Sequence, residues 1–315
     1  MAGRPGPGGA GRLTVRLGGY APPDSSHSSG LRRIAELLRQ RAGDDLTIEI
    51  EYNVLDRGGQ AHDLLDEVEA GARTLCYFST SYLTGRVPEL GIVDLPYLFE
   101  SAEVAHRVLD GDLGRELSER TRASTGLIPL GYWDNGVRHL SNRIRPVLHP
   151  GDCAGLRVRL QPSWAHEEYF RALGAVPVCI DLAEGIEQLR RGELDAQENP
   201  LANFMSYGID RLHPHLTLTG HAYGARGLYA SARQLAGWPE DHRRALAEAA
   251  AVAAREQRVT AQRIDLELKT RLIEQGGLVV EPTAEQRSAF ERAAQPVLER
   301  AHRRLGSGLF DLLRR

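Results

Sequence analysis

The segment that follows Pro239 limits most strongly what this chain can fold into. It continues to Glu274 without a further proline or glycine, and strong helix formers dominate it, chiefly alanine, arginine, glutamate and leucine. A helix over residues 239–274 is about 50 Å long, at about 1.5 Å per residue. Because this length exceeds that of one lobe of ordinary size, the segment predicts a helix that spans two lobes.

Upstream of this segment, strands and helices are predicted to alternate, which indicates an α/β protein with a largely parallel sheet. Apolar and alternating runs predict strands at residues 13–17, 46–52, 75–78, 127–133, 156–160 and 176–180. Apolar residues at helical spacing predict helices near residues 28–38, 60–70, 102–109, 113–121, 163–173 and 183–191. The strand–helix–strand order begins again near residue 156, so we expect a second lobe built like the first.

The composition excludes several classes of partner. The chain has 315 residues, 42% of them hydrophobic and 26% charged, which is enough for two folded lobes. The formal net charge is −3 and no long block of like charge occurs, so nucleic acid is not an expected partner. No apolar run approaches the roughly 18 residues of a membrane span. Residues 1–12 are rich in glycine and proline, so we expect a flexible tail there and no secretory signal peptide.

The cysteines and histidines do not form a recognisable metal or disulfide pattern. Cys76, Cys153 and Cys179 are too few for a disulfide framework and lack CxxC spacing. Cys76 and Cys179 lie in apolar runs typical of strands, so we expect both thiols to be buried and inert. His213 and His215 have no third ligand nearby, and a surface turn is the favoured interpretation. The sequence therefore predicts no metal site.

Motifs typical of enzymes are absent or misplaced. The GxGxxG spelling at residues 6–11 precedes the first predicted strand, whereas the dinucleotide fingerprint follows a strand. His166 begins a run like HExxH, but Phe170 stands where the second histidine is required. Ser79 lacks the GxSxG elbow of a serine nucleophile. We therefore expect no cofactor and no catalytic residue, and a chain that binds a ligand without chemistry.

Polar residues at predicted strand ends form the candidate binding site. Arg138, Arg159 and Asn199 each lie near the end of such a strand, where open α/β sheets bind ligands. The planar arginine fork matches a carboxylate with two parallel hydrogen bonds, and an asparagine amide adds an orienting donor and acceptor. These three side chains predict a site for a small carboxylate.

Three motifs surround these residues. The pattern W-x-N-G-x-R runs from Trp133 to Arg138, D-x-x-G-x-x-x-R from Asp152 to Arg159, and G-x-x-D-x-Q-E-N from Gly192 to Asn199. In this combination the chain resembles the solute-binding proteins of TRAP transporters, the DctP family. Further matches follow the family's order from about residue 13 to residue 277: Pro88–Leu90, Asp94–Phe99, Gly174–Pro177, Glu184 and Leu218–His221. The chain departs from the family's pattern at Ala196, where glycine is usual, and at residues 181–183.

The resemblance implies an α/β fold of the two-lobed, periplasmic-binding-protein-like kind, with a cleft between the lobes and a long helix bridging both. Lobe I would comprise residues 13–135 plus about 225–255, and lobe II residues 136–224 plus about 256–315. The resemblance also implies roles for individual residues. Arg159 is expected to be the main carboxylate clamp, Asn199 its orienting partner and Arg138 a second cationic contact. The pocket wall is expected to include Trp133, Tyr223, Ser79 and His27.

By the same resemblance, the chain is an extracytoplasmic protein that captures a small organic acid as its lobes close. It would then deliver the acid to the membrane subunits of a TRAP transporter, with no other membrane contact, and act in the periplasm. Two alternatives stay open. One is a ligand sensor of the same fold without a transport role, which the missing signal peptide favours. The other is an enzyme acting on an organic acid, with Glu198 and Asp181 as the nearest acid/base candidates.

Overall fold

The computed structural model describes residues 12–274 and 278–314, so the expected tail lies outside the described residues except for Arg12. Its strands are β1 (Leu13–Gly18), β2 (Leu46–Glu51), β3 (Leu75–Ser79), β4 (Leu127–Asn142), β5 (Arg157–Leu160), β6 (Val176–Cys179), β7 (Ala196–Asn199), β8 (His215–Ser231) and β9 (Leu278–Val280). Its helices are α1 (Ser26–Ala42), α2 (Asp63–Ala70), α3 (Ala102–Asp110), α4 (Asp112–Ser124), α5 (Trp164–Ala172), α6 (Leu182–Arg190), α7 (Leu201–Ser206), α8 (Ala232–Leu235), α9 (Glu240–Glu274), α10 (Ala284–Leu305) and α11 (Ser307–Asp311). The α/β class and the long helix predicted from the sequence are confirmed.

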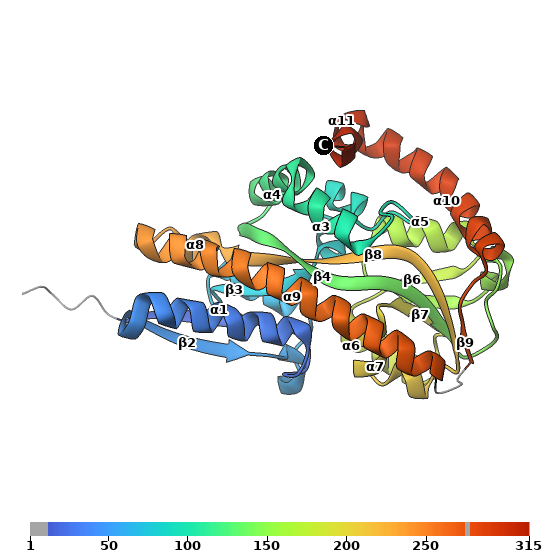
Figure 1. Cartoon of the computed structure of the whole chain (residues 1–315), viewed down its shortest axis with the longest axis horizontal. Coiled ribbons are helices and arrows are strands. Elements are labelled where there is room, and N and C mark those ends of the chain that lie inside the picture. The colour runs from blue at the N-terminus through green and yellow to red at the C-terminus, as the bar shows by residue number, and fades with distance from the viewer. Residues whose placement is uncertain (1–11, 275–277, 315) are drawn as a thin grey trace, which may run out of the picture.

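The strands form one mixed sheet in the order β2-β1-β3-β8-β4-β7-β5-β6, with β9 paired to β8. The parallel strands β1 to β3 lie at one end of the molecule and β5 to β7 at the other (Figure 1). Between them, β4 and β8 form one long antiparallel ladder, from the pair Leu127–Ser231 to the pair Asn142–His215. The ladder changes register at three points, between Pro129 and Tyr132, between Asp134 and Gly136, and between Arg138 and Leu140. The two long strands therefore run through both ends of the molecule.

Separate hydrophobic cores define the two lobes. One core holds Val15, Leu31 and Leu75 with their neighbours from β1, α1 and β3. At the other end, one core forms around Val158 and Phe170, and another around Leu189, Leu201 and Leu216. Since each end of the sheet buries its own apolar residues, the chain has two lobes joined through the middle of the sheet.

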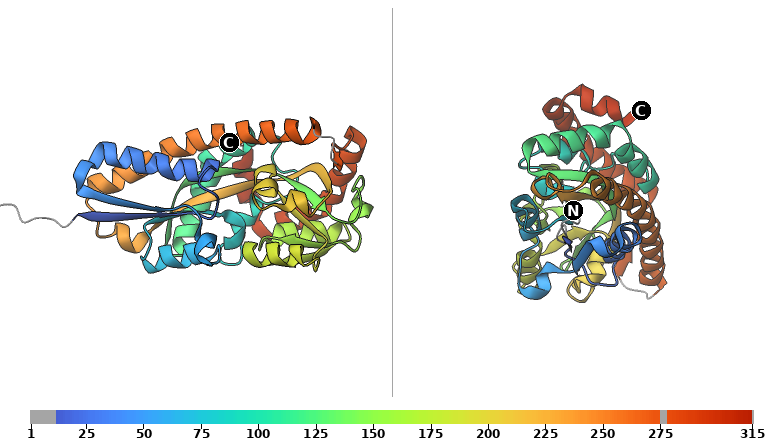
Figure 2. Two further views of the ribbon diagram at one scale, coloured as in Figure 1. Left: turned by 90° about the horizontal axis from the view of Figure 1, so that it is seen from below. Right: turned by 90° about the vertical axis from the view of Figure 1, so that its left-hand side faces the viewer.

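Two helices cross from lobe to lobe. α9 packs against α1 and β4 and also against α7, and Figure 2 shows it along most of the molecule's length. α10 contributes Phe290 to a core at the second end and Ala301 to the core at the first, with Pro296 between them inside the helix. Among the described residues, no helix has the length and apolarity needed to cross a membrane.

The prediction of strands was incomplete at the middle of the sheet. β4 continues nine residues beyond the predicted end, and β8 was not predicted at all. Gly220, Gly224 and Gly227 interrupt the apolar alternation of β8, and glycine is depleted in strands. Here the glycine is needed, because a Cβ at Gly227 would overlap the Tyr229 ring.

One cysteine prediction was wrong. Cys76 is buried as expected, but Cys179 is exposed. The second buried cysteine is Cys153. Cys179 ends β6, which is the edge strand of the sheet and therefore has a neighbouring strand on one side only. An apolar run does not distinguish an edge strand from a central one.

A substitution at Gly30 tests how closely α1 packs against Trp133 of the sheet. Alanine normally stabilises a helix by about 1 kcal/mol relative to glycine. A Cβ at Gly30, however, would lie 2.6 Å from Cη2 of the buried Trp133 ring. We expect Gly30→Ala to lower the free energy of unfolding by about 1–3 kcal/mol in urea, as overpacking does. Gly308→Ala in α11, where a Cβ meets nothing within 4 Å, is the control. Equal stability of the two variants would contradict this packing.

Candidate ligand-binding site

Arg159 lies at the carboxyl end of β5, opposite Gln197 of the parallel strand β7. Its side chain is buried, and Nη2 donates to the Tyr82 hydroxyl at 3.1 Å and to the Ile180 carbonyl at 2.9 Å. Its Nε has no hydrogen-bond partner. Burial raises the pKa of Tyr82 to about 12, although the charge of Arg159 opposes the shift. Since the phenol stays neutral at ordinary pH, neither of these partners compensates the positive charge.

Arg138 is also buried, but it is paired. Its Nη2 donates to Glu198 Oε1 at 2.8 Å and to the Glu198 carbonyl at 2.9 Å, and its Nε forms a further ion pair with the same carboxylate. Nη2 also reaches Asn199 Oδ1 at 3.4 Å, because β4 and β7 are adjacent antiparallel strands. Only Nη1 is without a partner. The structure thus brings Arg138 and Asn199 together and leaves Arg138 one donor for a ligand.

Glu198 and Asp181, the two acid/base candidates, are both engaged in the structure. Burial alone raises the pKa of Glu198, but the charge of Arg138, assisted by His166 and His221, outweighs it and holds the pKa well below the usual range. Asp181 accepts a hydrogen bond from the Ala183 amide at the start of α6 and pairs with His62. Neither carboxylate is placed as a free acid beside Arg159.

Three of the expected wall residues lie together in an aromatic group around Tyr77. The His27 ring centroid is 5.1 Å from that of Tyr77, and the Trp133 centroid is 5.5 Å from it. His27 Nε2 and Trp133 Nε1 are buried without hydrogen-bond partners. Ser79 ends the same strand as Tyr77, and its hydroxyl donates to Gln161 Oε1 of the other lobe at 3.1 Å. Burial, with the charge of Arg226, lowers the pKa of His27 well below its ordinary value, so this imidazole is neutral.

Arg226 belongs to the same group and was missed in the sequence. It lies on β8, with Trp133 of β4 as its partner on one side and Ser79 of β3 on the other. The side chain is 1% exposed, and both Nε and Nη1 lack hydrogen-bond partners. Its guanidinium carbon lies 4.4 Å from the centroid of the Tyr20 ring. An arginine between Ala225 and Gly227 was the available signal, but it gains meaning only once β8 is recognised as a strand.

A cavity of about 270 Å³ lies beside this group, between the start of α1 and α7. His27 lines it from lobe I and Asn203 from lobe II, with Ile264 of α9 also in the wall. Asn203 donates to Asn199 Oδ1 at 3.4 Å. The cavity is therefore lined by residues of both lobes, and one of them, Asn203, is hydrogen-bonded to Asn199 of the predicted site.

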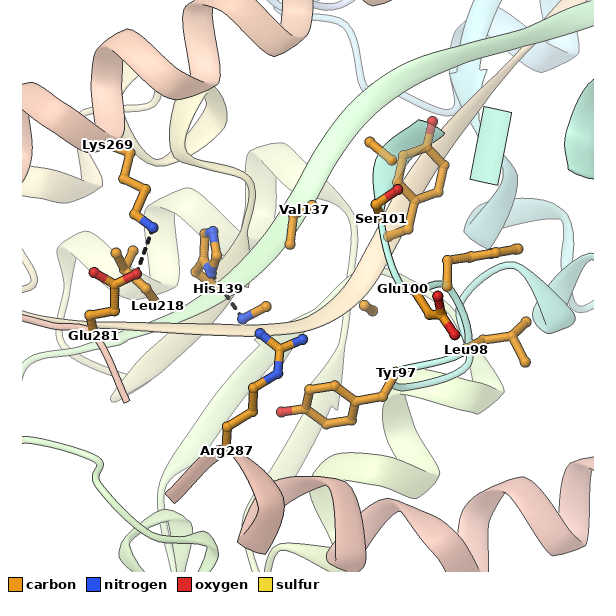
Figure 3. Close-up of a pocket in the computed structure, with 15 residues that line it drawn as sticks. Tyr97, Leu98, Glu100, Ser101, Val137, His139, Leu218, Lys269, Glu281 and Arg287 are labelled. Carbon is orange, nitrogen blue, oxygen red and sulfur yellow. Dashed lines mark hydrogen bonds and ion pairs between the residues drawn. The ribbon is translucent and has the colours of Figure 1, made fainter. Parts of the chain in front are cut away.

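Tyr223 was expected in the same wall, and the structure places it elsewhere. Successive strand residues point to opposite faces of a sheet, and Tyr223 is an odd number of residues from Arg226. It lines a second cavity, of about 210 Å³, together with Tyr97, His139, Lys269, Glu281 and Arg287 (Figure 3).

The cationic groups of this second cavity are already compensated. Lys269 Nζ lies 2.6 Å from Glu281 Oε1, and Arg287 pairs with Glu291 at 3.0 Å. His139 Nδ1 accepts the Gly220 amide at 3.0 Å, and burial lowers the pKa of His139 to about 3. A carboxylate ligand would therefore find no unpaired cation here. In the described part of the chain, no group of three or more His, Cys, Asp or Glu side chains is placed to hold a metal ion.

A two-lobed α/β fold with unpaired guanidinium groups at the lobe junction defines a binding protein for a small solute. The family described as bacterial extracellular solute-binding protein, family 7 (DctP), matches residues 17–304. The chain belongs to this family, and the resemblance drawn from its motifs is confirmed.

Individual relatives agree with this assignment. The C4-dicarboxylate-binding periplasmic protein DctP of Rhodobacter capsulatus is 27% identical and covers 94% of this chain and 88% of its own length. The uncharacterized protein y4mM of Sinorhizobium fredii is 34% identical over 67% of this chain, but this chain spans only 38% of that protein's length. The crystal structure of the sugar acid binding protein DctPAm from Advenella mimigardefordensis, in complex with galactonate, has a TM-score of 0.89 and 26% identity. That match covers 96% of this chain and 97% of the other.

The Arg138–Glu198 pair generates a test of stability. Glu198→Gln leaves a buried guanidinium without its charge partner, so we expect a loss of about 3–5 kcal/mol in the free energy of unfolding, measured in urea. Because folding lowers the pKa of Glu198, the pair's contribution is complete above the ordinary value of 4.5 and is lost as the pH falls below it.

Glu168→Gln removes the exposed partner of Arg300 and is the matched control. It should cost less than about 1 kcal/mol. Equal losses in the two variants would show that the buried pair does not support the fold.

Proposed function

We propose that this protein captures a small organic acid between its lobes and delivers it to the membrane subunits of a TRAP transporter. The observation that carries the proposal is Arg159, a buried guanidinium at the lobe junction whose hydrogen-bond partners are a neutral phenol and a carbonyl. A C4-dicarboxylate and galactonate, which the names of two relatives give as ligands, are both acids. An acid ligand would supply the missing negative charge.

In this mechanism Arg159 is the main clamp of the ligand carboxylate. Asn199 orients the carboxylate, and Nη1 of Arg138 is the remaining donor beside it. Closure of the lobes removes water from the ion pair and so strengthens its charge-assisted hydrogen bonds. Bonds from Arg159 to Tyr82 and from Ser79 to Gln161 cross between the lobes and stabilise the closed form.

The proposed lobes are those expected from the sequence, with residues 13–135 plus about 225–255 in lobe I and 136–224 plus about 256–315 in lobe II. The register change between Asp134 and Gly136 supports a hinge at this boundary. Gly136 has a φ of 105°, which a residue with a side chain rarely adopts. A glycine at such a point permits the backbone rotation that closure requires.

The proposed place of action is the periplasm, and the proposed activity is binding without catalysis. The family description, which names extracellular solute-binding proteins, supports the location. The engagement of Glu198 with Arg138 supports the absence of chemistry, because it removes the nearest free acid or base. We propose no nucleic-acid partner and no direct contact with lipid.

A thermal-shift screen of the purified chain tests the proposal. Organic acids are compared with neutral sugars and amino acids. A ligand at 100 times its dissociation constant stabilises the folded form by about 2.7 kcal/mol, which is readily measured. We expect a shift for one class of acid and none for the controls. Stabilisation by the neutral compounds alone would refute carboxylate capture.

Arg159→Ala tests the clamp itself. Once a stabilising acid is found, we expect this variant to lose about 2–5 kcal/mol of binding free energy by calorimetry, because the buried carboxylate loses its partner. Arg190→Ala, which removes an exposed ion pair with Glu187, is the control and should bind as the parent does. Unchanged affinity in Arg159→Ala would remove this residue from the site.

Gly185→Ala tests the position of the clamp without deleting it. A Cβ at Gly185 would lie 2.8 Å from Arg159 Nε and 2.9 Å from Arg159 Cγ, so the side chain must move. We expect acid binding to weaken at least about tenfold, with the affinity measured by calorimetry. At Gly151 a Cβ meets nothing within 4 Å, so Gly151→Ala should leave the affinity unchanged. Full affinity in Gly185→Ala would mean that Arg159 does not bind the acid in this position.

A further inference from the structure

We propose that the ligand carries a second anionic group and that Arg226 binds it, on the opposite wall of the cleft from Arg159. The proposal rests on the function proposed above. It assigns a specificity-determining role to a residue outside the motifs that identify the family, and it narrows the ligand to an acid with two negative charges.

The argument begins with how buried arginines are neutralised in this protein. Five arginines are buried in the described part of the chain: Arg73, Arg138, Arg159, Arg226 and Arg258. Three of them are paired with acids, Arg73 with Glu51 and Glu67, Arg138 with Glu198, and Arg258 with Asp110. Arg159 and Arg226 form no ion pair with any described acidic residue. A buried charge without a partner is strongly unfavourable, so both positions call for an anion that the protein does not supply.

Stacking on tyrosine does not satisfy Arg226. The guanidinium carbon lies 4.4 Å from the Tyr20 ring centroid and 5.2 Å from that of Tyr77, which are cation–π distances. Such stacking uses the face of the group, whereas the N–H bonds lie in its plane. Nε and Nη1 keep their hydrogens without acceptors. The aromatic rings hold the guanidinium in a fixed orientation and leave these two N–H donors for an anionic acceptor, such as a carboxylate or a phosphate.

Arg226 and Arg159 are connected by two chains of side-chain contacts at the lobe junction. Tyr82, which accepts a hydrogen bond from Arg159, has its ring 4.8 Å from that of Phe78. Phe78 lies 5.0 Å from Tyr20, the ring beneath Arg226. A second connection runs through Ser79, the strand partner of Arg226, to Gln161, two residues after Arg159. One arginine is presented by each side of the junction, so a ligand with two anionic ends would bridge them.

The surroundings of Arg226 favour an anionic ligand group over an uncharged polar one. His27 is kept neutral, partly by Arg226 itself, and cannot supply a negative charge. Trp133 Nε1 is a further unpartnered donor in the same group. Donors therefore outnumber acceptors on this wall, and an anion accepts from several of them at once.

The experiment compares matched acids that differ by one anionic group. The pairs are succinate and monomethyl succinate, galactarate and galactonate, and 3-phosphoglycerate and glycerate, so that a second carboxylate and a phosphate are tested separately. Affinities are measured by calorimetry. We expect the member with two anionic groups in at least one pair to bind at least about 30-fold more tightly, as a buried charge pair predicts.

Variants then assign this preference to a residue. Arg226→Gln should abolish the preference and change the affinity for the singly charged member less than about threefold. Arg226→Lys, which keeps the charge but not the fork, should retain part of it. Arg159→Gln should weaken both members, and Arg190→Gln, at an exposed pair, neither. Thermal unfolding checks that each variant is folded. If Arg226→Gln is not folded, the comparison is made with Arg226→Lys.

The outcomes separate the two proposals. If acids bind but the wild type shows no preference for two charges, or if Arg226→Gln weakens both members equally, the second anion site is refuted and acid capture stands. If none of the six acids binds, the proposed function fails, and the role of Arg226 fails with it.

Discussion

The β4–β8 ladder is the constraint on which the rest of the structure depends. Because both strands pass through both lobes, neither lobe is complete without them, and the lobes can move only where the ladder permits. The register change at Asp134–Gly136 is the middle one of three irregular points in this ladder, between those at Pro129–Tyr132 and Arg138–Leu140. Trp133 and Arg226 lie just on one side of it and Arg138 on the other. These three residues, each with an unpaired polar atom, are therefore placed beside the register change by the same hydrogen bonds that connect the lobes.

Electrostatics distinguishes the buried arginines that the chain itself neutralises from those that we propose to bind a ligand. Arg138 and Arg258 are as buried as Arg159 and Arg226, but each has a carboxylate supplied by the chain. In the proposed mechanism, the unliganded protein carries the free-energy penalty of the other two arginines, and opening of the lobes lets water reduce this penalty. An anionic ligand reduces it differently, by favouring the closed form. Under this proposal, the same uncompensated charge disfavours closure of the empty protein and favours closure of the liganded one.

Much of this could be predicted from the sequence, because strand order along the chain and motif spacing are local properties. The long helix, the α/β class and the family followed from them, and Arg138 and Asn199 are indeed adjacent. What failed depended on which strands are neighbours in space. Arg226 is informative only because β3 and β4, remote in sequence, flank β8. To place Tyr223 correctly, one has to know which face of β8 it occupies. To predict the exposure of Cys179, one has to know that β6 is an edge strand.

The proline in α10 has a mechanical consequence. The helix is fixed in one lobe by Phe290 and in the other by Ala301, and Pro296 lies between these anchors. Proline has no amide hydrogen, so one turn of the helix lacks a hydrogen bond. Bending stiffness is lowest at that turn, and a rotation of the lobes can flex the helix there without drawing either anchor from its core. The outer helix thus has a flexible point of its own, and like the register change at Asp134–Gly136 it lies in a segment that connects the two lobes.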